Sequence, residues 1–177
     1  MRQKVTAARL EEFMKALASG LTQPVRVFLV GGATAVLLGW RDSTIDIDLK
    51  LEPDSDDLLR KLPLLKERLE INVELAAPDD FIPELPGWRD RSRFIRQEGS
   101  LTFLHYDFYA QALAKIERRH EVDIRDVDEL IRNQLVEPRR LLEFFSEIED
   151  RLYKYPAIDS STFRSAVEAA IARNSQD

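Results

Sequence analysis

The spacing of hydrophobic residues along this 177-residue chain changes near residue 105, from the alternation typical of strands to the wider spacing typical of helices. Before that point, the short apolar run Val25–Val30 predicts a buried strand. Residues 45–51 and 70–76 alternate apolar with polar side chains and predict two more strands, each with one apolar face. Residues 94–104 predict a hairpin.

Helical spacing predicts further segments in both parts of the chain. In the first part these are the stripe from Leu10 to Leu17, residues 33–40, and residues 54–68, where Pro63 is expected to interrupt the helix. The second part contains four such segments, which lie within residues 108–116, 123–131, 141–152 and 159–173.

These elements indicate an α+β fold, in which a mixed β-sheet core flanked by helices is followed by a C-terminal helical lobe. We expect residues 1–105 to form the core and residues 106–177 to form the lobe, packed on the core as one structural unit. No repeat or linker separates the two parts. The last residues, 174–177, are expected to fray.

The composition narrows the possible chemistry. The chain has no cysteine, which excludes disulfides, thiolate metal sites and cysteine nucleophiles. Its two histidines, His105 and His120, disfavour a histidine-rich zinc site. The N-terminal stretch lacks the continuous apolar region of a secretory signal, and no stretch approaches the roughly 18 apolar residues of a membrane span. We therefore expect a soluble, cytoplasmic protein that does not bind membranes.

The charge of the chain argues against a broad electrostatic grip on nucleic acid, because the formal net charge is -6. Three local basic clusters are nevertheless present: Arg89, Arg91, Arg93 and Arg96; Arg118, Arg119 and His120; and Arg139 and Arg140. Solvated faces or ion pairs are the ordinary interpretation of each cluster.

Gly31 and Gly32 separate the strand predicted at Val25–Val30 from the helix predicted at residues 33–40. Glycines permit a tight turn and let an anion approach the backbone closely. The start of the following helix also favours a phosphate group. The same two glycines are compatible with a plain turn as well.

Asp46 and Asp48 lie two residues apart on a predicted strand, so both carboxylates project from one face, about 6–7 Å apart. Their charges repel, and a hard divalent cation such as magnesium would relieve that repulsion. The alternative is a solvated polar face without a metal. The thirteen residues from Ala33 to Ile45 leave room for one helix and one turn, which brings the glycine turn and the acids to the same end of the sheet.

The Gly-Gly pair, this interval and the Asp-x-Asp strand together resemble the hallmark of the nucleotidyltransferases that share the DNA polymerase beta fold. That family carries Gly-Gly or Gly-Ser, then Asp-x-Asp or Asp-x-Glu, and a third acid on a later strand. The chain is similar to small prokaryotic members, including the abortive-infection type nucleotidyltransferase toxins, in which a helical half follows the catalytic half. The motif match covers about residues 25–51, and a looser similarity reaches about residue 128.

The resemblance implies that Gly31 and Gly32 cradle the triphosphate of a nucleoside triphosphate such as ATP. Ser43 or Thr44 would help them, and Arg41 would reach a phosphate, unless it forms an ion pair with a neighbour such as Asp42.

The resemblance also implies that Asp46 and Asp48 bind one or two Mg²⁺ (or Mn²⁺) ions. The third acid would be Glu74, as a metal ligand or base, where the family commonly has Asp. It lies on the polar face of the strand predicted at residues 70–76, whose apolar face carries Ile71, Val73 and Leu75. The alternative is a solvated glutamate.

Lys115 resembles a lysine of the related toxin-type enzymes and would neutralise triphosphate charge, unless it is a surface lysine. Asp123 and Asp126 either support that lysine or, as we favour, cap a helix. His105 and Asp107 would line the cleft or, as we favour, cap a helix. Trp40 and Trp88 would stack on a base or, as we favour, pack in the core.

We therefore expect a metal-dependent enzyme that transfers a nucleoside monophosphate to a hydroxyl or phosphate acceptor and releases pyrophosphate. An RNA end such as that of tRNA, a protein or a small molecule would be the acceptor. A toxin–antitoxin role with a cognate antitoxin would follow from the toxin-like members. The alternatives are a catalytically degenerate nucleotide-binding or protein-interaction module of the same fold, and a structural protein whose acidic face is merely solvated.

Overall fold

The computed structural model describes residues 2–175, which fall into two compact units. The first unit comprises Met1–Ala77 and Ser92–Tyr106, and the second comprises Pro78–Arg91 and Asp107–Asp177. The segment between residues 78 and 91 thus belongs with the helices that follow it in sequence.

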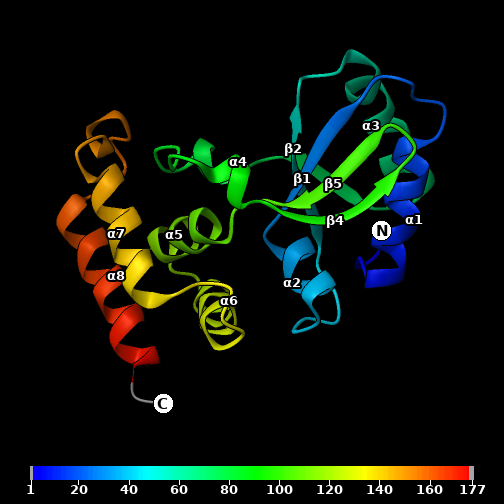
Figure 1. Ribbon diagram of the computed structural model, residues 1–177. Coiled ribbons are helices and arrows are strands. Elements are labelled where there is room, and N and C mark those ends of the chain that lie inside the picture. Colours follow the sequence, from blue (N-terminus) through cyan, green and yellow to red (C-terminus); the bar gives the residue numbers. More distant parts are fainter. Residues whose placement is uncertain (1, 176–177) are drawn as a thin grey trace. The chain divides into compact units, whose positions relative to one another are not determined.

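The first unit contains one five-stranded sheet in the order β3-β2-β1-β5-β4 (Figure 1). Its strands are β1 (Val25–Val30), β2 (Asp46–Glu52), β3 (Asn72–Leu75), β4 (Arg93–Glu98) and β5 (Leu101–His105). Neighbours β1–β5 and β2–β3 are parallel, whereas β1–β2 and β4–β5 are antiparallel. The sheet is therefore mixed, and the predicted α+β class is confirmed.

The hydrophobic core of this unit lies on one face of the sheet, under helices α1 (Ala7–Ala18) and α3 (Asp56–Arg68). The apolar stripe of α1 is buried, and Thr6 caps the start of α1, because its hydroxyl accepts a hydrogen bond from the Arg9 amide. Helix α2 (Gly32–Leu38) follows β1 directly and packs against β1 and β2.

Two local predictions in this unit are wrong. Pro63 lies inside α3 without interrupting it, because the buried stripe of Leu58, Leu62 and Leu65 holds the helix against the core and offsets the cost of the missing amide donor. Leu75 is 55% exposed instead of facing the core, because it is the last residue of β3, which is an edge strand.

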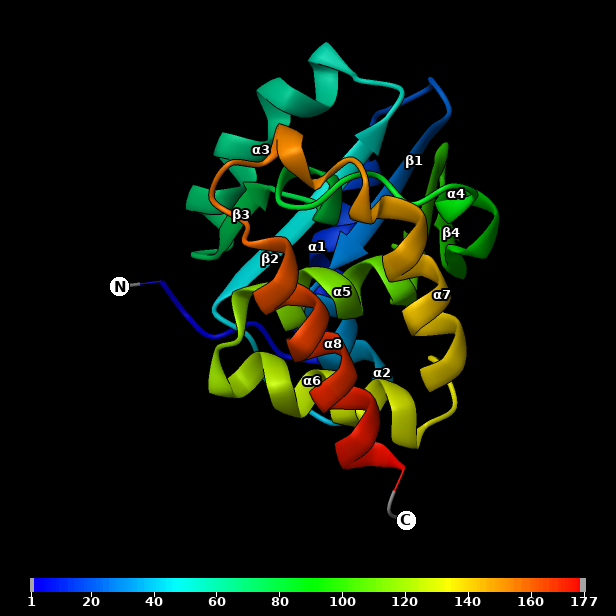
Figure 2. The ribbon, with the colours of Figure 1, turned by 90° about the vertical axis from the view of Figure 1, so that its left-hand side faces the viewer.

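The second unit is helical. Its elements are α4 (Trp88–Arg91), α5 (Phe108–Arg118), α6 (Glu121–Arg132), α7 (Pro138–Glu149) and α8 (Ser160–Asn174), with short 3₁₀ turns at Pro78–Asp80 and Leu152–Lys154. Helix α8 packs against α5, α6 and α7 (Figure 2). The segment of residues 78–88 is tied to these helices, since Tyr155 donates a hydrogen bond to the Asp79 carbonyl at 3.2 Å.

Two helix ends in this unit differ from prediction. Helix α7 ends at Glu149, and Leu152 lies in the following 3₁₀ turn. Asn174 does not fray, because it ends α8 and donates a hydrogen bond to Asp128 at 2.8 Å. The fraying predicted for residues 176 and 177 lies outside the described residues. None of the described helices is long and apolar enough to cross a membrane.

Candidate functional site

The turn between β1 and α2 requires glycine at both of its positions. Gly31 has a φ of 62° and a ψ of -123°, a conformation that only glycine adopts readily. A Cβ atom on Gly32 would lie 2.0 Å from the hydroxyl of Thr44, a distance that no side chain tolerates. Helix α2 has only seven residues, so the dipole at its N-terminus is weak. The candidate anion-binding element is therefore the backbone of the glycine turn itself.

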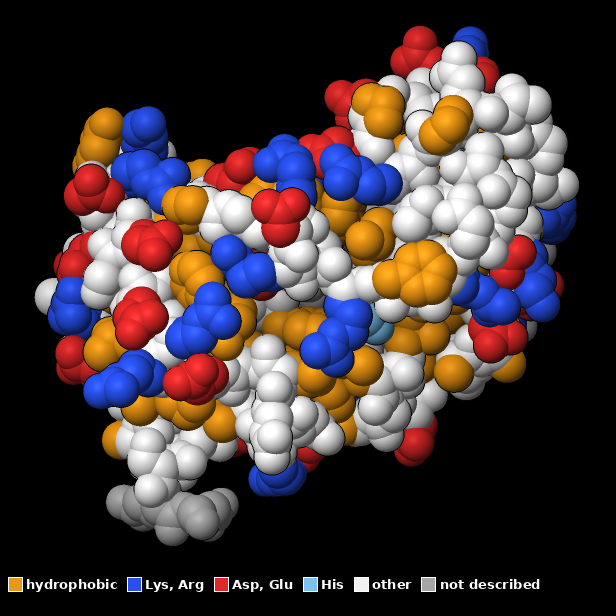
Figure 3. Space-filling view, in the orientation of Figure 1, with side chains coloured by type: hydrophobic (Ala, Val, Ile, Leu, Met, Phe, Trp, Pro, Cys, Tyr) orange, Lys and Arg blue, Asp and Glu red, His pale blue; other side chains and the backbone are white. Residues whose placement is uncertain are grey.

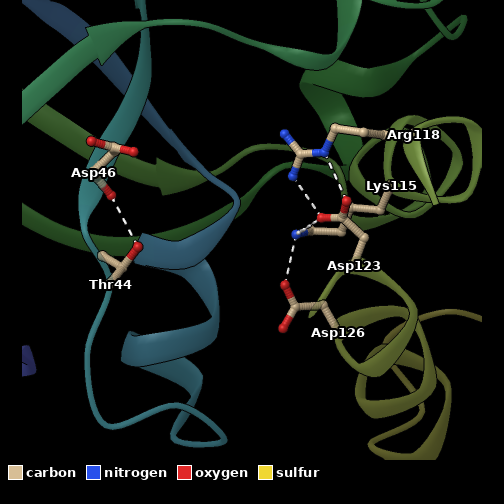
Figure 4. A network of polar contacts seen from close by, with 6 residues as sticks. All are labelled: Thr44, Asp46, Lys115, Arg118, Asp123 and Asp126. Carbon is tan, nitrogen blue, oxygen red and sulfur yellow. Dashed lines mark hydrogen bonds and ion pairs between the residues drawn. The ribbon is translucent and has the colours of Figure 1, made fainter. Parts of the chain in front are cut away.

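The segment that leads into β2 packs against this turn. Arg41 Nη1 lies 3.4 Å from the position that a Gly32 Cβ would occupy. Thr44 pairs with Val5 through two backbone hydrogen bonds of 2.7 and 2.9 Å, and its hydroxyl donates to the Asp46 carbonyl at 3.2 Å (Figure 4). Ser43 is half-buried beside Thr44. Arg41 and Thr44, two of the predicted nucleotide-binding residues, therefore lie against the glycine turn.

The predicted alternation of β2 is confirmed. Ile47, Leu49 and Leu51 are buried, whereas Asp46 and Asp48 are half-buried on the other face. Asp48 pairs in register with Val30 of β1, and its Oδ2 lies 3.3 Å from the position of a Gly31 Cβ. The second aspartate of the pair is thus adjacent to the glycine turn, at the same end of the sheet.

The predicted third acid lies on the neighbouring strand. Parallel pairing of β2 with β3 aligns Asp48 with Glu74 and Asp46 with Asn72, which places all four side chains on one face of the sheet. Asn72 donates hydrogen bonds to Asp46 at 2.5 Å and to Glu74 at 3.0 Å. Sequence reasoning missed Asn72, although its place two residues before Glu74 puts it on the polar face of the same strand.

The donor chemistry of this face fits magnesium, which prefers carboxylate oxygens. No three or more acidic or histidine side chains within residues 2–175 form a closed group that could hold a metal ion. An open site of one or two carboxylates is nevertheless the arrangement that magnesium commonly uses, since it completes its shell with substrate phosphates and water.

Lys115 belongs to the second unit, where it contacts two buried acids (Figure 4). Its Nζ lies 2.6 Å from Asp126 and 3.4 Å from Asp123, and Arg118 donates two hydrogen bonds to Asp123, at 2.6 and 2.7 Å. Lys115 is 8% exposed and is therefore not a surface lysine. The cap interpretation of the two aspartates is wrong, because α6 begins after His120 and both carboxylates pair with cations instead.

The electrostatics of this network explain why a buried carboxylate stays charged. Burial alone would raise the pKa of Asp123, but the hydrogen bond from Arg118 and the nearby charges of Lys115 and Arg118 lower the pKa below its ordinary value. Asp123 therefore serves as a fixed anion that holds Lys115.

His105 does not cap a helix, because it is the last residue of β5, and it contacts the helix that follows the glycine turn. Its Nδ1 is 3.1 Å from the Thr34 hydroxyl, and Thr34 lies in α2. Burial, with a further contribution from the charge of Arg93, lowers the pKa of His105 to about 4, so the ring is neutral at physiological pH. Asp107, by contrast, caps α5 as expected, because it accepts a hydrogen bond from the Tyr109 amide.

Of the two tryptophans, only Trp88 packs in the core as expected, whereas Trp40 is half-buried. Trp88 is fully buried, with Arg89 stacked 4.4 Å from its ring. Four members of the basic clusters form ion pairs: Arg89 with Glu84, Arg91 with Asp107, Arg96 with Glu98, and Arg118 with Asp123. Figure 3 shows basic and acidic side chains interspersed on the visible face, as expected for a solvated surface.

Comparison with known proteins gives one informative result. A protein-family model described as "Nucleotidyltransferase of unknown function (DUF6036)" matches residues 7–167. No curated protein and no solved structure matches the chain.

Proposed function

The chain belongs to the family described as nucleotidyltransferases of unknown function, and from this premise we propose that it transfers a nucleoside monophosphate from a nucleoside triphosphate to an acceptor, with release of pyrophosphate. In this reaction an acceptor oxygen bonds to the α-phosphorus. The bond from that phosphorus to the bridging oxygen breaks, and pyrophosphate leaves with the bridging oxygen.

One observation carries the proposal: the glycine turn and the Asp-x-Asp strand meet at one end of the sheet. Gly32 has no space for a side chain against Thr44, and Asp48 lies next to Gly31. A triphosphate over the turn would therefore have backbone donors on one side and the carboxylates of β2 on the other. Such positioning is the main catalytic resource in phosphoryl transfer.

We assign roles on this basis. Gly31 and Gly32 hold the triphosphate through their backbone, assisted by Ser43 or Thr44 and by Arg41. The side chains of Arg41 and Thr44 lie against the turn. Asp46 and Asp48 would hold Mg²⁺ or Mn²⁺, and Glu74, aligned with Asp48 on the next strand, would activate the acceptor hydroxyl either as a further metal ligand or as a base. The bound cation would neutralise charge on the triphosphate. By the resemblance to the toxin-type enzymes, Lys115 is assigned the neutralisation of triphosphate charge.

The acceptor is a hydroxyl or phosphate on an RNA end, such as that of tRNA, on a protein or on a small molecule. We further propose a cytoplasmic location and, by resemblance to toxin-like nucleotidyltransferases, a role as the toxin of a toxin–antitoxin pair.

A second candidate is a catalytically degenerate module that binds nucleotide without turnover. It is favoured by the absence, within residues 2–175, of a closed group of three acids. Glu74→Gln distinguishes the two candidates, because it would abolish transfer by an enzyme and leave nucleotide binding by a degenerate module unchanged.

The direct test is incubation of the protein with each α-labelled nucleoside triphosphate, magnesium and total RNA. We expect label on RNA or on the protein, and no label with Asp46→Asn/Asp48→Asn. Thr102→Val is a suitable control, because this residue lies on the same sheet and hydrogen-bonds to Gln97, away from the acids. Absence of transfer with all four nucleotides, despite nucleotide binding, would favour the degenerate module.

A further inference from the structure

Asn72 joins two of the predicted metal-binding acids. Its Nδ2 donates one hydrogen bond to Asp46 Oδ1 at 2.5 Å and another to Glu74 Oε1 at 3.0 Å. The parallel register aligns Asn72 with Asp46, two residues before Glu74 on β3. A single amide nitrogen therefore fixes the first aspartate of β2 relative to the acid on the next strand.

The orientation of this amide is itself fixed. Arg2 donates a hydrogen bond to the Asn72 side-chain oxygen, which directs the NH₂ group of the amide away from Arg2 and toward the acids. The segment that carries Arg2 is anchored to the residues just before β3, because both the backbone amide and the side-chain amide of Gln3 donate to Glu70 at 2.8 Å. Asn72 is thus held from both ends.

The bridge leaves room for a cation. Each hydrogen bond from Asn72 engages one oxygen of its carboxylate, so the second oxygen can bind a cation without breaking that hydrogen bond. An amide also adds no charge that would repel the cation or compete with it. Outer hydrogen bonds of this kind orient carboxylate ligands, and their loss typically weakens metal binding by about 10–100-fold.

We propose that Asn72 is a positioning residue of the nucleotidyltransferase site, which holds Asp46 and Glu74 in the arrangement that binds a divalent cation. This inference rests on the proposed function, because it presumes that the acids of β2 and β3 bind a cation. It assigns a role to Arg2 as well, since Arg2 orients the amide.

The test is the equilibrium affinity of the full chain for Mn²⁺, measured by electron paramagnetic resonance of the free ion without nucleotide. We expect Asn72→Ala to weaken Mn²⁺ binding by about 10-fold or more. Arg2→Met should weaken it less, because Asn72 remains beside the acids. Gln97→Ala is the matched control: this amide is exposed on β4 and donates to the Gly99 carbonyl at 2.9 Å, so its removal should leave the affinity unchanged.

The outcomes separate the two proposals. Equal Mn²⁺ affinity in the wild-type protein, Asn72→Ala and Arg2→Met would overturn the role of Asn72. The proposed function would survive if Asp46→Asn/Asp48→Asn still lost the ion. A wild-type protein that binds no Mn²⁺ would overturn both proposals. Urea unfolding of each variant shows whether it is folded, and Arg2→Met, which leaves the sheet intact, tests the inference even if Asn72→Ala does not fold.

Discussion

Asp46 and Asp48 on β2 and Asp123 and Asp126 on α6 are both pairs of closely spaced acids, but they lie in different electrostatic surroundings. Asp123 and Asp126 are 1% and 2% exposed and pair with Lys115. Asp46 and Asp48 are half-buried, and Asp46 accepts a hydrogen bond from a neutral amide.

The difference shows what each pair can do. A buried carboxylate is stable only with cationic or hydrogen-bonding partners, so the acids of α6 are committed to their network. A half-buried carboxylate held by an amide keeps its negative charge available to a ligand cation. Asp46 is therefore the candidate for cation binding, whereas Asp123 and Asp126 are committed to their contacts with Lys115.

The largest change in the free energy of unfolding is expected from a substitution that breaks the ion-pair network of Lys115, Arg118, Asp123 and Asp126. Asp123→Ala should lower the free energy of unfolding by about 3–5 kcal/mol, because it removes the partner of Arg118 and one of the two acids that hold buried Lys115. Asp46→Asn should change it by less than about 1 kcal/mol, since Asp46 is half-buried and accepts its hydrogen bond from the neutral amide of Asn72, which an asparagine at this position can still accept. Urea unfolding measures both, and equal losses would contradict the contrast.

The next largest effect is a dependence of the free energy of unfolding on pH, which His105 of the first unit causes. The folded protein holds the pKa of His105 at about 4, below the ordinary value of 6.5, because the ring is buried and lies near Arg93. The unfolded chain therefore binds a proton that the folded protein excludes, and stability falls as the pH is lowered from 6.5 to about 4, by at most about 3 kcal/mol.

Asp123 does not contribute to the loss of stability between pH 6.5 and about 4. Its pKa is lowered in the folded protein, so its stabilising effect is present above its ordinary value of 3.8 and is lost only as the pH falls below it. Urea unfolding between pH 7 and pH 4 should show the slope in the wild-type protein and a smaller slope in His105→Gln. An identical slope in the variant would show that other groups cause it.

A smaller effect on stability accompanies a large effect on binding at the glycine turn. Gly32→Ala should cost about 1–3 kcal/mol, because the new methyl group would overlap the Thr44 side chain, and it should abolish binding of magnesium–nucleotide. Gly20→Ala is the control, since Gly20 has a φ of 76° but open space around it. Calorimetric titration measures binding, and retained binding in Gly32→Ala would place the nucleotide elsewhere.

The smallest change in the free energy of unfolding is expected from the loss of a partly exposed ion pair. Arg173 contacts Asp128 at 2.7 Å, with side chains that are 42% and 24% exposed. Asp128→Ala should therefore lower the free energy of unfolding by less than about 1 kcal/mol. A loss as large as that of Asp123→Ala would show that burial does not separate the ion pairs of this unit.

The sequence predicted those features that depend on local pattern. The limits of β1 follow from an apolar run between Pro24 and Gly31, and the polar face of β2 follows from strict alternation. The glycine turn was recognisable because only a few residue types permit it. These features also carry the resemblance that the family match confirms.

Features that depend on tertiary contacts were not predictable. Asn72 meets Asp46 across 26 residues of sequence, and His105 meets Thr34 across 71, so no local pattern marks either contact. Pro63 was expected to interrupt α3, because local rules do not include the packing of that helix on the sheet. The partner of Lys115 was ambiguous because an aspartate near a helix start suits both a cap and an ion pair.

The central claim is that the glycine turn and the acids of β2 hold a magnesium–nucleotide together, and its most direct test is nucleotide-dependent stabilisation. The free energy of unfolding should be measured with each of the four nucleoside triphosphates, with magnesium and with chelator. At about 100 times its dissociation constant, at least one nucleotide should stabilise the wild-type protein by about 2.7 kcal/mol, only with magnesium, and should not stabilise Asp46→Asn/Asp48→Asn. Stabilisation by none of the four, or equal stabilisation of the double variant, would contradict the claim.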